Sequence, residues 1–288
     1  MKLGVVFPQT EIGADPTVLR EYVQTVEGLG YDYLMIYDHV LGANPDRPGG
    51  WTGPYTYLTQ FHEPMVLFGW MAALTQRLEL VTGVIILPQR QTALVAKQAA
   101  QISVLAGGRF RLGVGVGWNA VEYEGLGEDF HTRGKRVEEQ VTLLRALWTK
   151  PLVTFKGEFD TVTDAGINPL PVQPIPIWFG GDVDILLRRS ARLGDGWIPN
   201  PMPMPELRNR LNTLRQYITE AGRNPQDFGV DVRMSVSRTP QSEWVNEAAQ
   251  FDAMGVTHFA INTMGAGYQT LQDHLAAIKN FKSTLGNG

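Results

Sequence analysis

Three glycines spaced two residues apart are the feature of this sequence that most suggests chemistry. Gly113, Gly115 and Gly117 lie in the segment LAGGRFRLGVGVGW, which spans residues 105–118. Residues two apart on a strand point to the same face, so one face of this strand has no side chains near its end. Glycine weakens a strand and is usually kept where something comes close to the backbone. The pattern favours either a surface for a flat ring or a phosphate, or a bend at a barrel corner.

A charged pair, Asp38-His39, closes the apolar segment YDYLMIYDH. Histidine donates or accepts a proton near neutral pH, so His39 is a candidate catalytic residue. The alternative is a histidine held by a backbone carbonyl.

Two more glycine sites follow apolar segments. Thr82-Gly83 interrupts the run LELVTGVIILP, and a lone glycine in a central strand suggests a bulge or a close backbone approach. Gly180-Gly181 ends the segment IWFGGD just before a predicted helix. Free N–H groups and the helix dipole favour a phosphate there, although a simple tight turn explains the glycines equally well.

Short apolar runs alternate with helix-length amphipathic segments along the chain. The predicted strands are residues 3–7, 33–37, 78–87, 110–116, 176–179, 196–198, 229–235 and 258–261. The predicted helices are residues 16–29, 64–75, 92–105, 133–148, 183–193, 205–221, 242–254 and 271–281. Apolar strands each followed by a helix are typical of a parallel sheet buried on both faces.

These pairs predict an α/β fold, a single (β/α)8 TIM barrel with insertion loops that forms one domain over residues 1–288. A doubly wound open sheet is the main alternative. In a barrel, the ends of the second to fifth strands meet on one rim. Their residues then describe a site for a flat cofactor, with glycines beside the ring, a glycine–helix turn for its phosphate and His39 at the reactive edge.

Two connections are long. Residues 40–63 carry Trp51, Tyr55, Tyr57 and Phe61, and follow the end of a strand where barrels place active sites. We interpret this loop as a lid over the substrate, with a packed structural excursion as the alternative. Residues 150–176 are proline-rich and are predicted to contain a small hairpin at 153–159.

Composition excludes several classes of function. The chain has 25 Lys and Arg against 29 Asp and Glu, and this balance argues against a nucleic-acid partner. The absence of cysteine removes disulfides, thiolate catalysis and cysteine-ligated zinc. The five histidines form no H-x-H or H-E-x-x-H pattern, so no metal site is predicted. No signal peptide or membrane-length apolar run is recognised, which predicts a soluble, cytoplasmic protein without a membrane partner.

The predicted helix 64–75, PMVLFGWMAALT, is apolar on nearly every face. A helix that is exposed to solvent on one side shows a stripe of polar residues on that side. The absence of such a stripe predicts that this helix lies in a subunit interface and that the protein is a homodimer. The alternative is that a long loop of the same chain covers it.

The sequence resembles the luciferase-like monooxygenase superfamily of flavin- and deazaflavin-dependent oxidoreductases. The resemblance rests on GVVFPQ, GLGYDYLMIYDH, the stretch from Glu63 to Trp118, FHTR, EEQVTLLRALWT, PIPIWFGG and RLGDGWIP, and it covers nearly the whole chain. The family implies a (β/α)8 barrel with its cofactor at the C-terminal rim. It also implies a non-proline cis peptide or bulge behind the cofactor ring, which maps onto Gly83-Val84.

The resemblance further implies a catalytic histidine at His39. The implied cofactor contacts are Asp38, Thr82, Gly83, Val84, Gly115, Val116, Gly117, Trp118, Gly180 and Gly181. The family's sugar-phosphate dehydrogenase has a catalytic glutamate where this chain has Trp118, which argues against that reaction.

Nearby carboxylates are Glu122 and Glu63, of which Glu63 is expected to cap the helix that begins at Pro64. Arg90, Arg133 and Lys97 are expected to be loose surface charges.

The resemblance implies coenzyme F-420 and hydride transfer to or from a small organic substrate. The aromatic loop suggests that this substrate is flat or apolar. An FMN-dependent monooxygenase at the same site is the alternative. A cofactor-binding barrel without turnover is a third hypothesis, and a metal-dependent barrel hydrolase a remote fourth.

Overall fold

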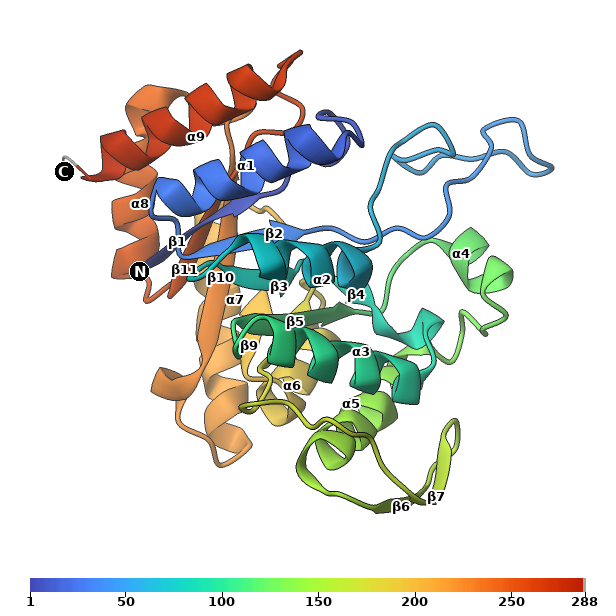
Figure 1. Cartoon of the computed structure of the whole chain (residues 1–288). Coiled ribbons are helices and arrows are strands. Elements are labelled where there is room, and N and C mark those ends of the chain that lie inside the picture. The colour runs from blue at the N-terminus through green and yellow to red at the C-terminus, as the bar shows by residue number, and fades with distance from the viewer. Residues whose placement is uncertain (287–288) are drawn as a thin grey trace.

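The computed structural model describes residues 1–286, whose parallel strands close into a ring enclosed by helices (Figure 1). The strands of the ring are β1 (Lys2–Val6), β2 (Tyr33–Ile36), β3 (Glu79–Thr82) with its continuation β4 (Ile85–Ile86), β5 (Phe110–Gly115), β8 (Ile177–Gly180), β9 (Gly196–Ile198), β10 (Gly229–Ser235) and β11 (His258–Asn262). Strand β11 pairs with both β10 and β1, and β3 pairs with both β2 and β5, so the ring has no open edge. The predicted TIM barrel is confirmed, and the open sheet is excluded.

Eight helices follow the strands of the barrel in turn. They are α1 (Pro16–Gly28), α2 (Pro64–Leu74), α3 (Thr92–Leu105), α5 (Arg133–Thr149), α6 (Asp184–Leu193), α7 (Met204–Glu220), α8 (Trp244–Ala253) and α9 (Leu271–Gly286). A short helix, α4 (Ala120–Gly125), lies with the β2–α2 loop at one end of the barrel in Figure 1. Single 3-10 turns occur at η1 (Leu87–Gln89), η2 (Pro225–Asp227) and η3 (Gln241–Glu243). Within the described residues, none of the helices has the length and apolar character needed to cross a bilayer.

Strand β2 shows why these runs become barrel strands. All four of its side chains are buried, and they alternate between two cores. Leu34 and Ile36 pack into the large core between strands and helices, whereas Tyr33 and Met35 fill the barrel interior. A strand buried on both faces needs this continuous apolar sequence, which is the pattern from which it was predicted.

Paired charges fill the barrel interior near the start of the strands. Arg111 donates to Asp231 at 3.0 Å and lies over the Trp178 ring at 4.1 Å, and the Tyr33 hydroxyl donates to the same carboxylate at 2.7 Å. Burial, together with Arg111, lowers the pKa of the neighbouring His258 to about 2, so this histidine is neutral. These buried charges are paired with one another, so the barrel interior is filled by packed polar side chains near the start of the strands.

Two sequence predictions of elements need correction, and one short helix was not predicted. The strand predicted over 78–87 is broken into β3 and β4, because the chain bulges at the cis Gly83-Val84 peptide that the family resemblance implied. The hairpin predicted at 153–159 is longer, with β6 (Val153–Lys156) and β7 (Thr161–Ala165) joined by a turn that Gly157 closes through its bond to Asp160. Helix α4 was missed because six residues are too few to show a helical period.

One face of α2 is uncovered in the single chain. Six of its residues are buried, but Val66 is 72% exposed and Ala73 is exposed. On the neighbouring helix α3, Leu94 is 53% exposed. The long loop over residues 40–63 therefore does not cover Val66, contrary to one of the two explanations offered for this apolar helix.

Candidate active site

A cavity of about 550 Å³ opens at the carboxyl ends of the barrel strands. The predicted site residues that line it are Asp38, His39, Gly83, Val84, Gly115, Val116, Gly117, Trp118, Gly180 and Gly181. They come from the ends of β2, β3, β5 and β8, so the barrel brings together the separate sequence signals. Thr82 does not line the cavity. It is buried behind it, and its hydroxyl donates to the carbonyl of Gly113 at 2.7 Å.

The glycines of β5 and β8 leave room for the side chain of a neighbouring residue, Val84. A methyl group added at Gly115 would lie 2.7 Å from one methyl of Val84, and one added at Gly180 would lie 2.7 Å from the other. At Gly117, which has φ +67°, the nearest atom would be Ile86 at 2.8 Å. A close approach to the backbone was one of the two explanations offered for the strand glycines, the other being a bend at a barrel corner. Val84 and Ile86 make such an approach and form the apolar floor of the cavity, and the approach of a cofactor ring or phosphate stays a prediction.

His39 is held by a buried carboxylate. Its Nδ1 lies 3.1 Å from Oε1 of Glu122, which is 1% exposed. The same oxygen accepts the backbone N–H groups of Val40 at 2.8 Å and Leu41 at 3.3 Å. Burial acts to raise the pKa of Glu122, but the bonds from His39 and the two amides outweigh it and lower the pKa below its ordinary value. The ionised carboxylate therefore fixes the imidazole, whose Nε2 has no hydrogen-bond partner within residues 1–286.

Asp38 is already engaged by protein groups. Arg90 donates to both of its carboxylate oxygens, at 2.9 and 3.0 Å, and also to Glu63 at 3.0 Å. Burial raises the pKa of Asp38, and Arg90 opposes that rise. Glu63 caps α2 as predicted, by accepting from Val66 N–H at 2.7 Å. Arg90, expected to be a loose surface charge, is instead a mostly buried bridge between two carboxylates.

Arg133 and Lys97, which were also expected to be loose surface charges, have partners within the protein as well. Arg133 lies over the Phe130 ring at 3.7 Å and donates to the Phe130 carbonyl, and Lys97 donates to the carbonyl of Asn168. Neither contributes to the cavity.

Aromatic rings of the long β2–α2 loop close over His39. The His39 ring lies 4.7 Å from Phe61, 4.9 Å from Tyr55 and 5.7 Å from Trp118, between ring centres. Trp51 packs against Trp118 at 5.7 Å. Farther out on the loop, Tyr57 and Leu58 are 62% and 77% exposed. The inner part of the loop thus covers the histidine, as a lid does, and its tip projects beyond the barrel in Figure 1.

The Gly180-Gly181 turn leads into α6. Gly181 has φ +125° and donates its N–H to the Ile198 carbonyl at 3.1 Å. No side chain caps the first turn of α6, and the carboxylate of Asp184 is turned toward Arg188 at 3.0 Å. The helix N-terminus is therefore open beside the cavity and suits an anionic group of a cofactor.

Sequence reasoning missed the wall formed by β9 and β10. Its residues are Ile198, Asn200, Pro201 and Arg233, together with Tyr37 and Asp182 nearby. The signal was present in the strand GVDVRMS, where Asp231 and Arg233 alternate with apolar residues. Charges inside a strand buried on both faces point to the barrel interior or to a site. Within the described chain, no group of three or more His, Asp or Glu side chains is placed to hold a metal ion.

Comparisons with known proteins show which family and fold this chain resembles. The sequence profile of a family described as luciferase-like monooxygenase matches residues 1–281. An uncharacterized protein of Mycobacterium tuberculosis is 32% identical over 97% of this chain and 98% of its own length. An F-420-dependent glucose-6-phosphate dehydrogenase of Amycolatopsis mediterranei is 31% identical over 69% of this chain, but over only 57% of its own length. A pyrimidine monooxygenase of Allorhizobium ampelinum is 33% identical over 61% of this chain and 47% of its own.

Solved structures share the fold. An F-420-dependent secondary alcohol dehydrogenase, bound to an F-420–acetone adduct, superposes with a TM-score of 0.82 at 18% identity, over 99% of this chain and 98% of its own. A monooxygenase from Streptomyces bottropensis superposes with a TM-score of 0.76 at 17% identity, over 100% and 99% of the two chains.

The contact between Gly180 and Val84 predicts a specific stability coupling. Gly180→Ala should lower the free energy of unfolding by about 1–3 kcal/mol, since its methyl group would displace Val84. Adding Val84→Ala should recover part of that loss, because the two positions are in contact. Urea unfolding of the single and double variants measures the coupling. Gly69→Ala on α2, where an added methyl meets nothing within 4 Å, is the control. A Gly180→Ala variant as stable as the parent protein would contradict the role given to Val84.

Proposed function

Because the chain belongs to the luciferase-like monooxygenase family, we propose that this oxidoreductase uses coenzyme F-420 for hydride transfer to or from a small organic substrate. The observation that carries the proposal is His39, held by Glu122 at the edge of an apolar floor made by Val84. This arrangement offers a proton-transfer group beside an apolar surface in a cavity of about 550 Å³, which suits a cofactor ring. Sequence relatives described as F-420-dependent glucose-6-phosphate dehydrogenases support the choice of cofactor.

Different residues of the cavity bind different parts of the cofactor. Val84 supplies the face on which the ring rests, and the glycines at 115 and 180 let that side chain stand there. The N-terminus of α6, after Gly181, receives the cofactor's phosphate. Asp38, on the cavity lining, is paired with Arg90, and Thr82 acts from behind the cavity by tying β3 to β5.

When bound, the deazaflavin supplies the hydride or accepts it. His39 moves the accompanying proton to or from the substrate's oxygen or other acidic atom, through Nε2. Glu122 keeps the Nδ1 side of the ring engaged, so only Nε2 is available to the cavity. The rings of Tyr55, Phe61 and Trp118 keep water away from that exchange and present an apolar wall to the substrate.

The binding preference of the protein for two cofactors tests the proposal directly. Fluorescence titration of the cofactor-free protein with F-420 and, separately, with FMN should give micromolar or tighter binding of F-420 and weaker binding of FMN. Preference for FMN would favour the monooxygenase alternative, which oxygen consumption with reduced FMN would then establish. Binding of neither would overturn the assignment of this cavity as a cofactor site.

Substitution of His39 tests its role in proton transfer. His39→Asn should lower turnover by about 10²–10⁴-fold with an unchanged cofactor dissociation constant, because the loss is one of acid–base chemistry. Glu122→Gln should lower kcat by a smaller factor and shift the pH profile of turnover, since it removes the charge beside the imidazole. Glu124→Gln, an exposed position on the same helix, is the control. Unchanged kinetics in His39→Asn would remove this residue from the mechanism.

We further propose that the uncovered face of α2 and α3 is the interface of a homodimer. Val66 and Leu94 are exposed apolar side chains on neighbouring helices, where a solvated surface would carry polar residues. Light scattering at micromolar concentration should give twice the mass of one chain, and Val66→Lys should shift the protein toward monomer. Leu152→Lys, at an exposed apolar residue beside β6, should leave the mass unchanged. A monomeric parent protein would contradict the interface.

A further inference from the structure

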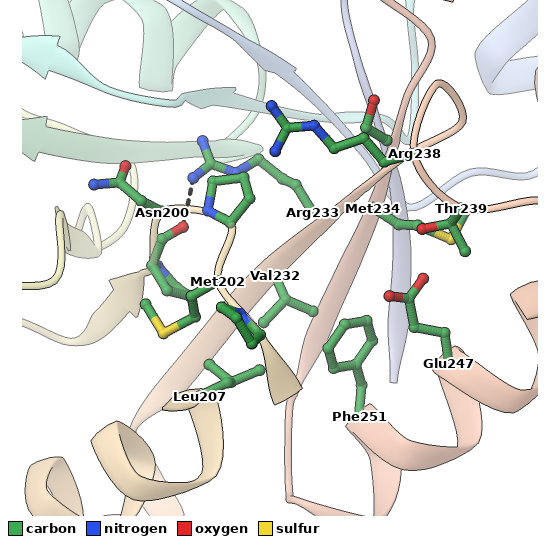
Figure 2. A pocket seen from close by; sticks show the side chains of 14 residues that line it. Asn200, Met202, Leu207, Val232, Arg233, Met234, Arg238, Thr239, Glu247 and Phe251 are labelled. Carbon is green, nitrogen blue, oxygen red and sulfur yellow. Dashed lines mark hydrogen bonds between the residues drawn. The ribbon is translucent and has the colours of Figure 1, made fainter. Parts of the chain in front are cut away.

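A second pocket adjoins the cavity at the wall formed by β9 and β10. It has a volume of about 330 Å³ and lies between β10, α7, α8 and the 199–203 segment (Figure 2). The two pockets share Asn200, Pro201 and Arg233. Arg233 therefore lies between the cofactor cavity and this second pocket, which we call the annexe. The proposed reaction gives this arginine no role.

Arg233 has no carboxylate partner within residues 1–286. One of its terminal nitrogens donates to the carbonyl of Pro199, and its Nε is buried without a hydrogen-bond partner. Asp231, two residues earlier on the same face of β10, is already paired with Arg111. A guanidinium that lines both pockets, with a single hydrogen bond from its terminal nitrogens and no carboxylate partner among the described residues, suits a ligand oxygen.

The surrounding charges favour an anion at this point. Arg238 is exposed, and within the described chain it makes no ion pair; Figure 2 shows its side chain running in the same direction as that of Arg233, toward Asn200. The acidic residues nearby are Asp182, on the lining of the main cavity, and Glu247, on the lining of the annexe. Neither carboxylate forms an ion pair with Arg233 or Arg238. Arg233 acts on Asp231 only at a distance, because that carboxylate is ion-paired with Arg111, and its guanidinium carbon lies 5.7 Å from the centre of the Tyr37 ring, so both guanidinium groups can still pair with a ligand anion.

We propose that Arg233 binds an acidic group of the substrate, a carboxylate or a phosphate, with Arg238 as a second cation at the mouth of the annexe. This inference rests on the proposed function, because His39 and Arg233 line the same cavity and would act on two ends of one molecule. The substrate is then an organic acid or phosphate ester with an apolar body, held by charge-assisted hydrogen bonds at one end and by aromatic and aliphatic side chains along its length.

The cofactor's own acidic tail is the other source of such an anion. The open N-terminus of α6 after Gly181 offers that tail a separate place, at the end of β8, which β9 separates from β10. We therefore assign Arg233 to the substrate, and the experiment distinguishes the two sources.

A matched pair of probes tests the site without turnover. Calorimetric titration of the cofactor-free protein with 3-phenylpropionate and with its neutral amide should show tighter binding of the carboxylate, by roughly tenfold or more for a hydrogen bond to a charged group. Arg233→Gln should abolish this preference, Arg233→Lys should keep part of it, and Arg238→Gln should reduce it. Arg208→Gln, an exposed position on α7, should leave it intact. Equal or undetectable binding of the two probes to the parent protein would overturn the proposal.

Repetition with cofactor-saturated protein separates substrate from cofactor. Carboxylate binding should persist, and Arg233→Gln should bind F-420 and FMN as the parent does. Displacement of the carboxylate by the cofactor, with weakened cofactor binding in Arg233→Gln, would assign the arginine to the tail and overturn the proposal. If the parent protein binds neither cofactor, the proposed function fails, whereas a carboxylate preference that depends on Arg233 would still establish the anion site.

Discussion

The candidate active site depends on how closely three strands approach the side chain of Val84. This residue lies in the break between β3 and β4, and its two methyl groups occupy the space that side chains at Gly115 on β5 and Gly180 on β8 would need. Any side chain at either glycine would move Val84 or separate the strands. The cavity floor, its width and its apolar character therefore follow from one steric constraint, because closely packed interiors cannot absorb an extra methyl group without a shift.

A buried carboxylate sets the polar edge of the same cavity. Glu122 accepts hydrogen bonds from His39 and from the backbone of Val40 and Leu41, so it joins α4 to the start of the lid. The cost of burying this charge is offset by these three donors and by the side-chain amide of Gln89 at 3.4 Å, which is the usual condition for an ionised group in a protein interior. Histidine, lid and short helix are thus positioned by the hydrogen bonds of one carboxylate.

Charged side chains are paired differently at the two ends of the barrel. At the start of the strands, Arg111 and Asp231 neutralise each other in a packed interior. At the opposite rim, Arg90 satisfies Asp38 and Glu63, and these groups are unavailable to a ligand. What remains at the rim is the imidazole of His39, the guanidinium of Arg233 and the carboxylate of Asp182. Because Asp38 is paired with Arg90, these three groups are the ones, charged or titrating near neutral pH, that the cavity lining can direct at a ligand.

The sequence by itself determined the barrel, because strands buried on both faces must be continuously apolar and each is followed by a helix of recognisable period. It also identified His39, the Gly83-Val84 break and the two glycine sites, since glycine and histidine at strand ends are unusual enough to be noticed. Only the tertiary structure decided what those residues touch. The glycines at 115 and 180 contact a valine that is distant in sequence, and Glu122 meets His39 across 83 positions of the chain. Arg233 became a site residue only when the barrel closed, because its role depends on which carboxylates the fold pairs with other cations, and no local pattern records that pairing.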